Sequence, residues 1–252
     1  MSRFSNLTFS LFALFACSSP SAPEPPVVAS AAARPEIIIE EITSANPIVV
    51  DGTARSFENT VAIRVRDERG ALMHETFTTS RGESGQHNPF TAEIYLTRYP
   101  GTAITVEALE YSAKDGAERS LVKKAIRYQV ATMESLLQFP RNDCAPMYPY
   151  RRKMPKSVGA ARLLAEALVQ GPTAAEAATG ATNPFPSGSA VRGVNLRDGV
   201  LTIDFNERLQ NVGGSCAVTA IRSAVERTMK ALPNVRKVVI TANGSEDMAL
   251  QP

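Results

Sequence analysis

The spacing of apolar residues changes once along this chain, near residue 130, and this change constrains the fold more than any other feature. Before residue 130, apolar and polar side chains alternate in short segments, as in residues 60–66. Successive side chains of a β-strand point to opposite faces, so this period predicts half-buried strands. After residue 130, apolar residues recur at helical spacing, as in residues 217–232. The sequence therefore predicts a region of strands followed by a region of strands and helices.

The first region is predicted to be a β-sandwich. Turn residues separate its segments; for example, Asp67 to Gly70 lies between two of them and predicts a hairpin. Seven short strands over about 95 residues, with no helical stretch between them, are typical of an immunoglobulin-like sandwich. The predicted strands are residues 37–42, 48–54, 60–66, 72–79, 90–96, 103–111 and 121–130.

The second region is predicted to be an α+β domain with helices on one face of a small sheet. A helix is expected over residues 157–169, with Ser157 as its N-cap, and a second short helix should open at the capping-box pair Thr173 and Glu176. A hairpin over residues 191–205 has an Asp-Gly turn, and a helix over 217–232 precedes a closing strand over 236–241. The predicted fold class is mainly β plus α+β.

The N-terminus has the pattern of a bacterial lipoprotein signal. Arg3 precedes an apolar run of about ten residues, which is too short to span a membrane. Cys17 follows this run, where a lipoprotein carries its lipidated cysteine, and the alternative is an ordinary secretory signal that ends near a cysteine. We expect a signal peptide over residues 1–16, and a lipidated Cys17 that begins a proline-rich linker over 17–35. The lipid would anchor the protein outside the cytoplasm, on the cell membrane or the outer membrane.

The composition of the chain excludes few functions. The net charge is +2, with 21% charged residues, which is too small an excess to predict a nucleic-acid partner. Outside the leader, no apolar run approaches the roughly 20 residues of a membrane-spanning helix.

Two cysteines remain when Cys17 is assigned to lipid. Cys144 and Cys216 lie 72 residues apart, and export to an oxidising compartment favours a disulfide between them. Free thiols are the second interpretation. A metal site or catalytic thiol lacks nearby partners, because His74 and His87 both lie in the first region. We predict no metal and no cofactor.

Short motifs in both regions resemble known envelope modules. The second region resembles a GerMN domain, the sporulation and spore germination module of many bacterial envelope lipoproteins. Its matching pieces are Asp143-Cys144 and residues 152–155, 168–173, 186–189, 200–205, 213–216 and 250–252. The first region is similar to the immunoglobulin-like domain that accompanies spore germination proteins, through residues 50–55, 67–70 and 112–116. The resemblance places the two domains at residues 36–130 and 134–252.

The resemblance implies an extracytoplasmic lipoprotein without enzymatic activity that binds or assembles in the cell envelope, with sporulation or germination as one setting. The leading hypothesis is a binding or scaffolding role toward an envelope protein or a cell-wall polymer. The second hypothesis is a self-associating subunit of an envelope assembly, which would make the protein a homo-oligomer. A hydrolase of cell-wall polymer ranks last.

The densest positive cluster is the candidate binding surface. Arg151, Arg152, Lys153 and Lys156 follow Tyr148 closely, and they could contact an anionic wall polymer or phospholipid head groups. The commoner explanation of such a cluster is a solvated strand edge that its charge protects against pairing.

Two patterns suggest catalysis only weakly. Asp204 and Glu207 could form the carboxylate pair of a glycosidase, but this spacing more often solvates or caps a chain. Ser215 lacks the Gly-x-Ser-x-Gly pattern of a nucleophile, so we expect it to be the N-cap of the following helix. We predict no catalytic residue.

Overall fold

The computed structural model describes residues 36–83, 85–141, 146–210 and 212–250. The predicted signal peptide, Cys17, the linker and Cys144 lie outside the described residues. Among the residues that are described, no helix is both long enough and apolar enough to cross a membrane.

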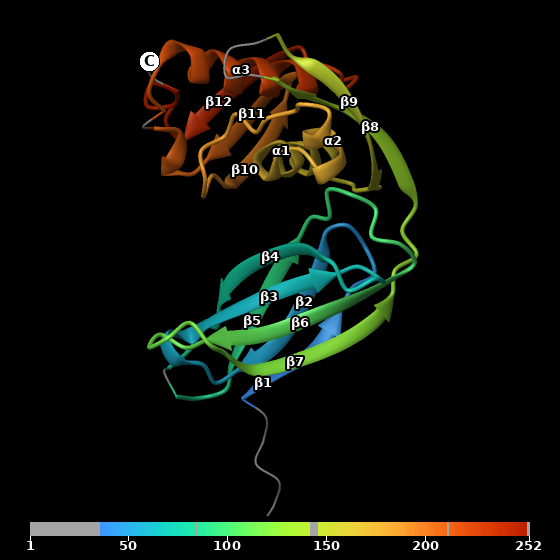
Figure 1. Cartoon of the computed structure of the whole chain (residues 1–252). Helices are drawn as coiled ribbons and strands as arrows, with labels where there is room; N and C mark the ends of the chain where they lie inside the picture. Colours follow the sequence, from blue (N-terminus) through green and yellow to red (C-terminus); the bar gives the residue numbers. More distant parts are fainter. Residues whose placement is uncertain (1–35, 84, 142–145, 211, 251–252) are drawn as a thin grey trace, which may run out of the picture. The chain divides into compact units, whose positions relative to one another are not determined.

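The first region forms the predicted sandwich (Figure 1). One sheet has the order β1-β2-β5, formed by Ile37–Ile42, Ile48–Ala54 and Asn88–Ile94. The other has the order β4-β3-β6-β7, formed by Leu72–Thr79, Thr60–Arg66, Ala103–Tyr111 and Glu118–Arg127. All pairings in both sheets are antiparallel. The immunoglobulin-like prediction is confirmed.

Alternating apolar side chains fill the space between the two sheets. Val50 and Phe90 from one sheet share a buried cluster with Ile63 and Val106 from the other. Gly52 of β2 permits this packing, because a Cβ atom there would lie 2.6 Å from the Phe90 ring and 2.2 Å from the Ile38 carbonyl oxygen. Because side chains alternate along a strand, every second residue of these strands lies on the outside of the sandwich.

The described residues of the second region form two small sheets and three α-helices. Strands β8 (Thr132–Phe139) and β9 (Tyr148–Pro155) pair as an antiparallel ribbon. Strands β10 (Val191–Arg197), β11 (Val200–Phe205) and β12 (Lys237–Ala242) form the second sheet, in which β12 runs parallel to β11. The turn between β10 and β11 uses Asp198 and Gly199, both at positive φ, as the sequence predicts.

The helices α1 and α3 differ from the predicted ranges by one to three residues at each end, and their predicted N-caps are wrong. Helix α1 (Ala160–Gln170) begins after Gly159, and Ser157 is not its N-cap; the Ser157 hydroxyl accepts the Gly159 N–H at 3.2 Å. Helix α3 (Ser215–Met229) starts with Ser215 as its first helical residue, so the predicted N-cap role of Ser215 is also wrong. In both cases a glycine occupies the capping position and provides no side chain to cap the helix. The capping box of α2 (Ala174–Ala178) is confirmed.

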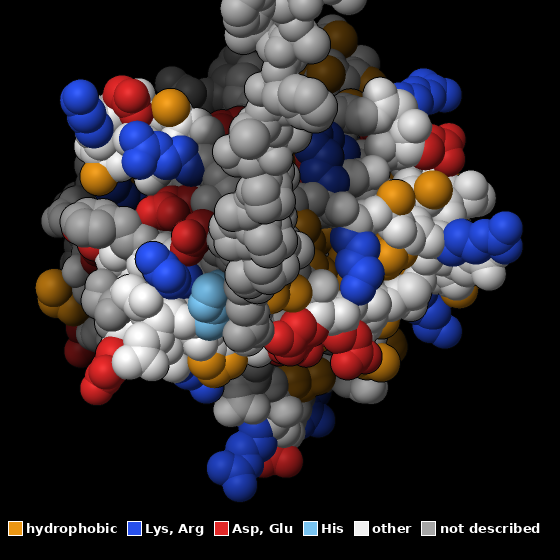
Figure 2. All heavy atoms as spheres, turned by 90° about the horizontal axis from the view of Figure 1, so that it is seen from below, with side chains coloured by type: hydrophobic (Ala, Val, Ile, Leu, Met, Phe, Trp, Pro, Cys, Tyr) orange, Lys and Arg blue, Asp and Glu red, His pale blue; other side chains and the backbone are white. Residues whose placement is uncertain are grey.

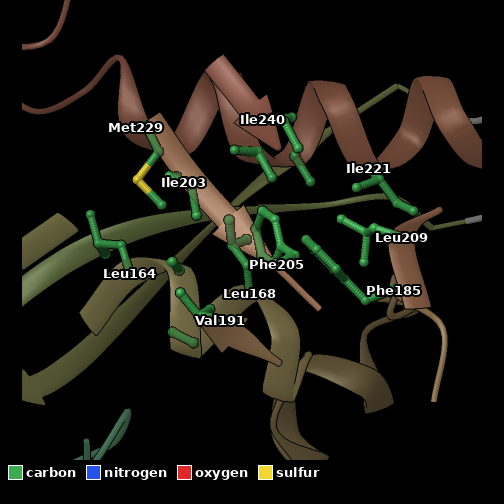
Figure 3. Close-up of a cluster of buried hydrophobic side chains, with 14 of the residues drawn as sticks. Leu164, Leu168, Phe185, Val191, Ile203, Phe205, Leu209, Ile221, Met229 and Ile240 are labelled. Atoms are coloured by element: carbon green, nitrogen blue, oxygen red, sulfur yellow. The ribbon is translucent and has the colours of Figure 1, made fainter. Parts of the chain in front are cut away.

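One apolar core holds this region together (Figure 3). Ile203 and Phe205 of β11 pack in the same cluster as Leu168 of α1 and Ile221 of α3, and the Phe185 and Phe205 rings are 5.6 Å apart. Thr202 and Asp204, which alternate with them, are only half-buried. The central strand therefore turns its apolar face to the helices, as expected of an α+β domain.

Candidate functional site

The predicted basic surface is divided by the pleat of strand β9. Arg151 and Lys153 are exposed on one face of the strand, and Lys156 is exposed beyond its end. Arg152 lies on the other face, and only 5% of its side chain is accessible. The prediction that these four residues form one surface is therefore wrong for Arg152, because adjacent residues of a strand point to opposite faces.

Arg152 has a structural role. Its Nε donates to Glu176 Oε1 at 3.0 Å, its Nη2 pairs with Glu176 Oε2, and Nη2 also donates to the Gly171 carbonyl oxygen at 3.1 Å. Burial raises the pKa of Glu176, but the Arg152 guanidinium and the Thr173 N–H outweigh burial and hold that pKa below its usual range. Arg152 therefore ties strand β9 to helix α2 and to the connection between α1 and α2.

Tyr148 also lies apart from Arg151 and Lys153. Burial alternates along β9, and Tyr148 falls on the same, less exposed side as Arg152. The Arg141 guanidinium stacks over the Tyr148 ring at 4.2 Å. On the exposed face of the ribbon, Arg151 pairs with Glu134 at 3.5 Å. The positive charge of the exposed residues, Arg151, Lys153 and Lys156, is thus partly neutralised.

The other residues that the sequence singled out serve the fold or stay untested. Asp204 Oδ1 accepts the Thr241 hydroxyl at 2.8 Å and the Gly244 N–H at 2.7 Å, so this carboxylate fixes a turn. Within the described ranges, no group of three or more His, Cys, Asp or Glu side chains could hold a metal ion. Cys216 lies in the first turn of α3, and its pairing with Cys144 remains a prediction.

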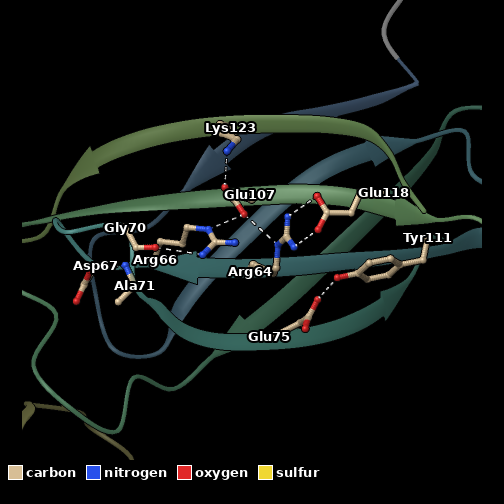
Figure 4. A network of polar contacts seen from close by, with 10 residues as sticks. All are labelled: Arg64, Arg66, Asp67, Gly70, Ala71, Glu75, Glu107, Tyr111, Glu118 and Lys123. Carbon is tan, nitrogen blue, oxygen red and sulfur yellow. Dashed lines mark hydrogen bonds and ion pairs between the residues drawn. The ribbon is translucent and has the colours of Figure 1, made fainter. Parts of the chain in front are cut away.

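The sequence did not point to the most organised polar surface, which is the outer side of the four-stranded sheet (Figure 4). Ile63 and Val65 of β3 face the core, so Arg64 and Arg66 point outward from the same strand. Glu107 of β6 lies directly opposite Arg64 in the register. We call this surface the outer face and define it by Arg64, Arg66, Phe77, Glu107, Tyr111 and Lys123.

Three cations surround Glu107 on the outer face. The Glu107 side chain is fully buried, and Arg64 Nε, Arg66 Nε and Lys123 Nζ lie 2.9, 3.0 and 2.8 Å from its carboxylate oxygens. Burial raises the pKa of Glu107, but the hydrogen bonds from Lys123 and Arg66 and the charge of Arg64 outweigh it and lower that pKa. Glu107 is therefore ionised at neutral pH and fixes the three cations in place.

A backbone irregularity brings a second carboxylate to this network. Ser120 has a positive φ of 52°, at a register shift between β6 and β7. The extra residue changes the alternation of β7, so Glu118 points to the same side as Lys123 and binds both terminal nitrogens of Arg64, at 2.5 and 3.1 Å. Such a bulge redirects a side chain at a cost in backbone energy.

The far end of the outer face carries exposed aromatic surface. Phe77 of β4 is 60% exposed, and its ring centre lies 6.2 Å from that of Tyr111 on β6. The Tyr111 hydroxyl donates to Glu75 at 2.6 Å, and this hydrogen bond raises the pKa of Tyr111. Both rings line a hollow of about 220 Å³. The outer face thus combines a fixed ionic network with an accessible aromatic pair.

Two family models match the chain. Residues 38–117 match the immunoglobulin-like domain of bacterial spore germination, and residues 136–247 match a domain described as sporulation and spore germination. The chain carries domains of two bacterial spore germination families. Both matches lie inside the ranges expected from the sequence, 36–130 and 134–252, whose boundaries stay predictions. A search of curated proteins gives no match.

Two solved structures are similar to part of this chain. The tandem GerMN domains of the sporulation protein GerM from Bacillus subtilis are 18% identical, with 46% of this chain and 40% of that chain covered and a TM-score of 0.39. The first GerMN domain of the same protein is 21% identical, with 44% of this chain and 84% of that chain covered and a TM-score of 0.38. The chain therefore spans 40% of the length of the tandem structure.

Most of the outer face lies within the matched immunoglobulin-like domain. The one sequence signal for it is the presence of charged residues, Arg64, Arg66 and Glu107, inside predicted strands where a solvent-facing threonine would suffice. Their spacing does not show that they meet. In the view of Figure 2, Lys and Arg side chains are interspersed with Asp and Glu. The outer face differs from that mixture because its charges are fixed by one buried carboxylate.

Proposed function

We propose that this spore germination family protein is lipid-anchored through Cys17 in the bacterial cell envelope and binds an envelope component through the outer face without covalent chemistry. The leader and Cys17 support the anchor, and the two family matches support an envelope setting. The anchor would lie in the cell membrane or the outer membrane. A disulfide between Cys144 and Cys216, which export would favour, would brace the second domain.

The single observation that carries the binding role is the construction of the outer face. A buried ion pair contributes little net stability compared with apolar packing, so the Glu107 network is poorly explained as reinforcement of the sandwich. Its clear physical effect is to hold Arg66 and Lys123 at fixed positions on a rigid sheet, and a fixed side chain loses little entropy on binding. Phe77 and Tyr111 add aromatic surface of the kind that dominates binding energy in interfaces.

Co-sedimentation with purified envelopes tests this proposal. The full chain, purified in detergent, is mixed with envelopes from a strain that lacks it, and the bound fraction is compared for the wild type and Phe77→Ser. Phe77 packs on the outer surface and not in the core, so the variant should fold, and we expect its bound fraction to fall at least fivefold.

Glu93→Ser is the matched control, because Glu93 is exposed on β5 of the other sheet. Equal binding by Phe77→Ser and Glu93→Ser would remove the outer face from the proposal. Release of soluble wall fragments by the wild type would contradict the absence of covalent chemistry.

Self-association is a second candidate function, favoured by a different surface. Val158 is fully exposed and Leu196 is 44% exposed, and both line a hollow of about 580 Å³ with Leu232. Exposed apolar side chains gathered at one hollow are typical of an interface. Light scattering on the full chain tests this: Val158→Ser should shift an oligomer to monomer, and a wild type that is monomeric at high concentration would exclude it.

A further inference from the structure

The outer face contains a second hollow, of about 410 Å³, between strands β3 and β7. Its lining includes the small side chains of Ala103, Thr105 and Ala125 beside the longer side chains of Arg66 and Lys123. A volume of this size is within the range of sites for small ligands. The strands therefore form a shallow trough with charged walls.

One end of the trough is positive. Glu107 closes this end and is shared by Arg64, Arg66 and Lys123. Because Glu118 also pairs with Arg64, three cations and two carboxylates leave one positive charge in excess beside the trough. Arg66 is fixed twice, since its Nη1 also donates to the Gly70 carbonyl oxygen at 3.1 Å. The side chains of Arg66 and Lys123 are 29% and 57% exposed, so a ligand can reach both.

The opposite end is negative. Asp67 and Glu68 line the trough where β3 enters its turn. The Asp67 carboxylate accepts the N–H groups of Arg69 and Ala71 at 2.9 and 2.8 Å, and Glu68 accepts the Thr102 N–H at 3.2 Å. Both carboxylates are therefore fixed at this end, as the two cations are fixed at the other.

We propose that this trough binds a short zwitterionic peptide, with its carboxylate at Arg66 and Lys123 and its ammonium group at Asp67 and Glu68. The inference rests on the proposed function and names the chemical class of the component that the outer face recognises. Charge complementarity decides the class, because a purely anionic ligand would be repelled by Asp67 and Glu68 and a purely cationic one by Arg66 and Lys123. The peptide can be free or attached to a wall polymer.

Calorimetric titration of the full chain with alanyl-alanyl-alanine, whose only charges are at its two ends, tests the assignment. We expect saturable binding of this tripeptide, at least tenfold weaker binding of its N-acetylated and C-amidated form, and no binding of inorganic phosphate. Soluble wall fragments with free peptide ends, titrated in parallel, should bind more tightly than the tripeptide if the polymer is the source and equally if it is not.

Adjacent lysines of β7 provide a matched pair of variants. Lys123→Gln should weaken binding of the tripeptide about tenfold, which is the effect of losing one charge-assisted hydrogen bond. Lys124→Gln removes the same charge from the next residue, whose Nζ donates to the Glu40 carbonyl oxygen away from the trough, and it should change binding less than twofold.

Three results would overturn the inference: no binding of the tripeptide, equal binding of the blocked form, or equal effects of Lys123→Gln and Lys124→Gln. Circular dichroism spectra confirm that both variants are folded. If the tripeptide fails to bind while wild-type protein still sediments with envelopes and Phe77→Ser does not, only the peptide assignment fails and the proposed function stands.

Discussion

Replacement of Glu107 by glutamine should destabilise the immunoglobulin-like domain by about 3 kcal/mol. Removing one partner of a buried ion pair costs about 3–5 kcal/mol, because the other charge is left buried without compensation. The structure places Glu107→Gln at the lower limit of this range of destabilisation. Arg64 keeps its pair with Glu118, and Lys123 is 57% exposed and can be hydrated. Arg66 keeps its bond to the Gly70 carbonyl oxygen, so the buried Nε of Arg64 bears most of the loss. Glutamine has nearly the same volume as glutamate and leaves no cavity.

Urea unfolding of the full chain at pH 7, followed by circular dichroism, measures this effect. Glu93→Gln is the control, since Glu93 is an exposed acid on β5, and it should change the free energy of unfolding by less than about 0.5 kcal/mol. A loss below about 1 kcal/mol in Glu107→Gln would refute the argument that Glu107 compensates buried cations.

The pH dependence provides a second readout of the same network. The pKa of folded Glu107 lies below its ordinary value of 4.5, so the ionised carboxylate contributes stability that is fully present above pH 4.5. This contribution is lost as the pH falls through the lowered folded pKa. The stability difference between wild type and Glu107→Gln should therefore be constant above pH 4.5 and shrink below it. A difference that grew in acid would contradict the sign of the shift.

Three further sets of variants test the anchor, the disulfide and the two faces of β9. Cys17→Ser should move the protein from the membrane fraction to the soluble fraction, and retention in the membrane would contradict lipid anchoring. Cys144→Ser and Cys216→Ser should each cost about 4 kcal/mol on the chain-entropy model, with no added loss in the double variant, and additive losses would contradict a disulfide. Arg152→Met should cost about 3 kcal/mol by leaving Glu176 unpaired, while exposed Arg151→Met should cost less than about 0.5 kcal/mol, and equal losses would contradict the division of β9 into two faces.

Apolar periodicity predicted the sandwich well because every strand has one face on the core. Five of the seven predicted strands, including residues 60–66 and 103–111, have the bounds that the structure shows. The exceptions are β5, which begins at Asn88, and β7, whose bulge at Ser120 breaks the period that the prediction relied on. No bounds are predicted for the ribbon of β8 and β9. Arg152 points inward but lies in the charged run from Arg151 to Lys153, so residue type does not show the alternation of buried and exposed positions.

The candidate site was much harder to predict than the fold. A basic cluster that is contiguous in sequence proved to be split between two faces of a strand. The network around Glu107 joins residues from three strands that are up to 59 positions apart, from Arg64 to Lys123. Only the register of β3, β6 and β7 brings these residues together, and a single sequence does not specify that register.

Site-specific photocrosslinking in intact cells shows whether the outer face is the binding surface. A benzoylphenylalanine residue replaces either Phe77 on the outer face or Glu93 on the opposite sheet, and crosslinked products are compared by gel shift and mass spectrometry. If the outer face binds an envelope component, envelope adducts should form at position 77 and be clearly reduced at position 93. Adducts of equal yield at both positions, or adducts at position 93 alone, would contradict it.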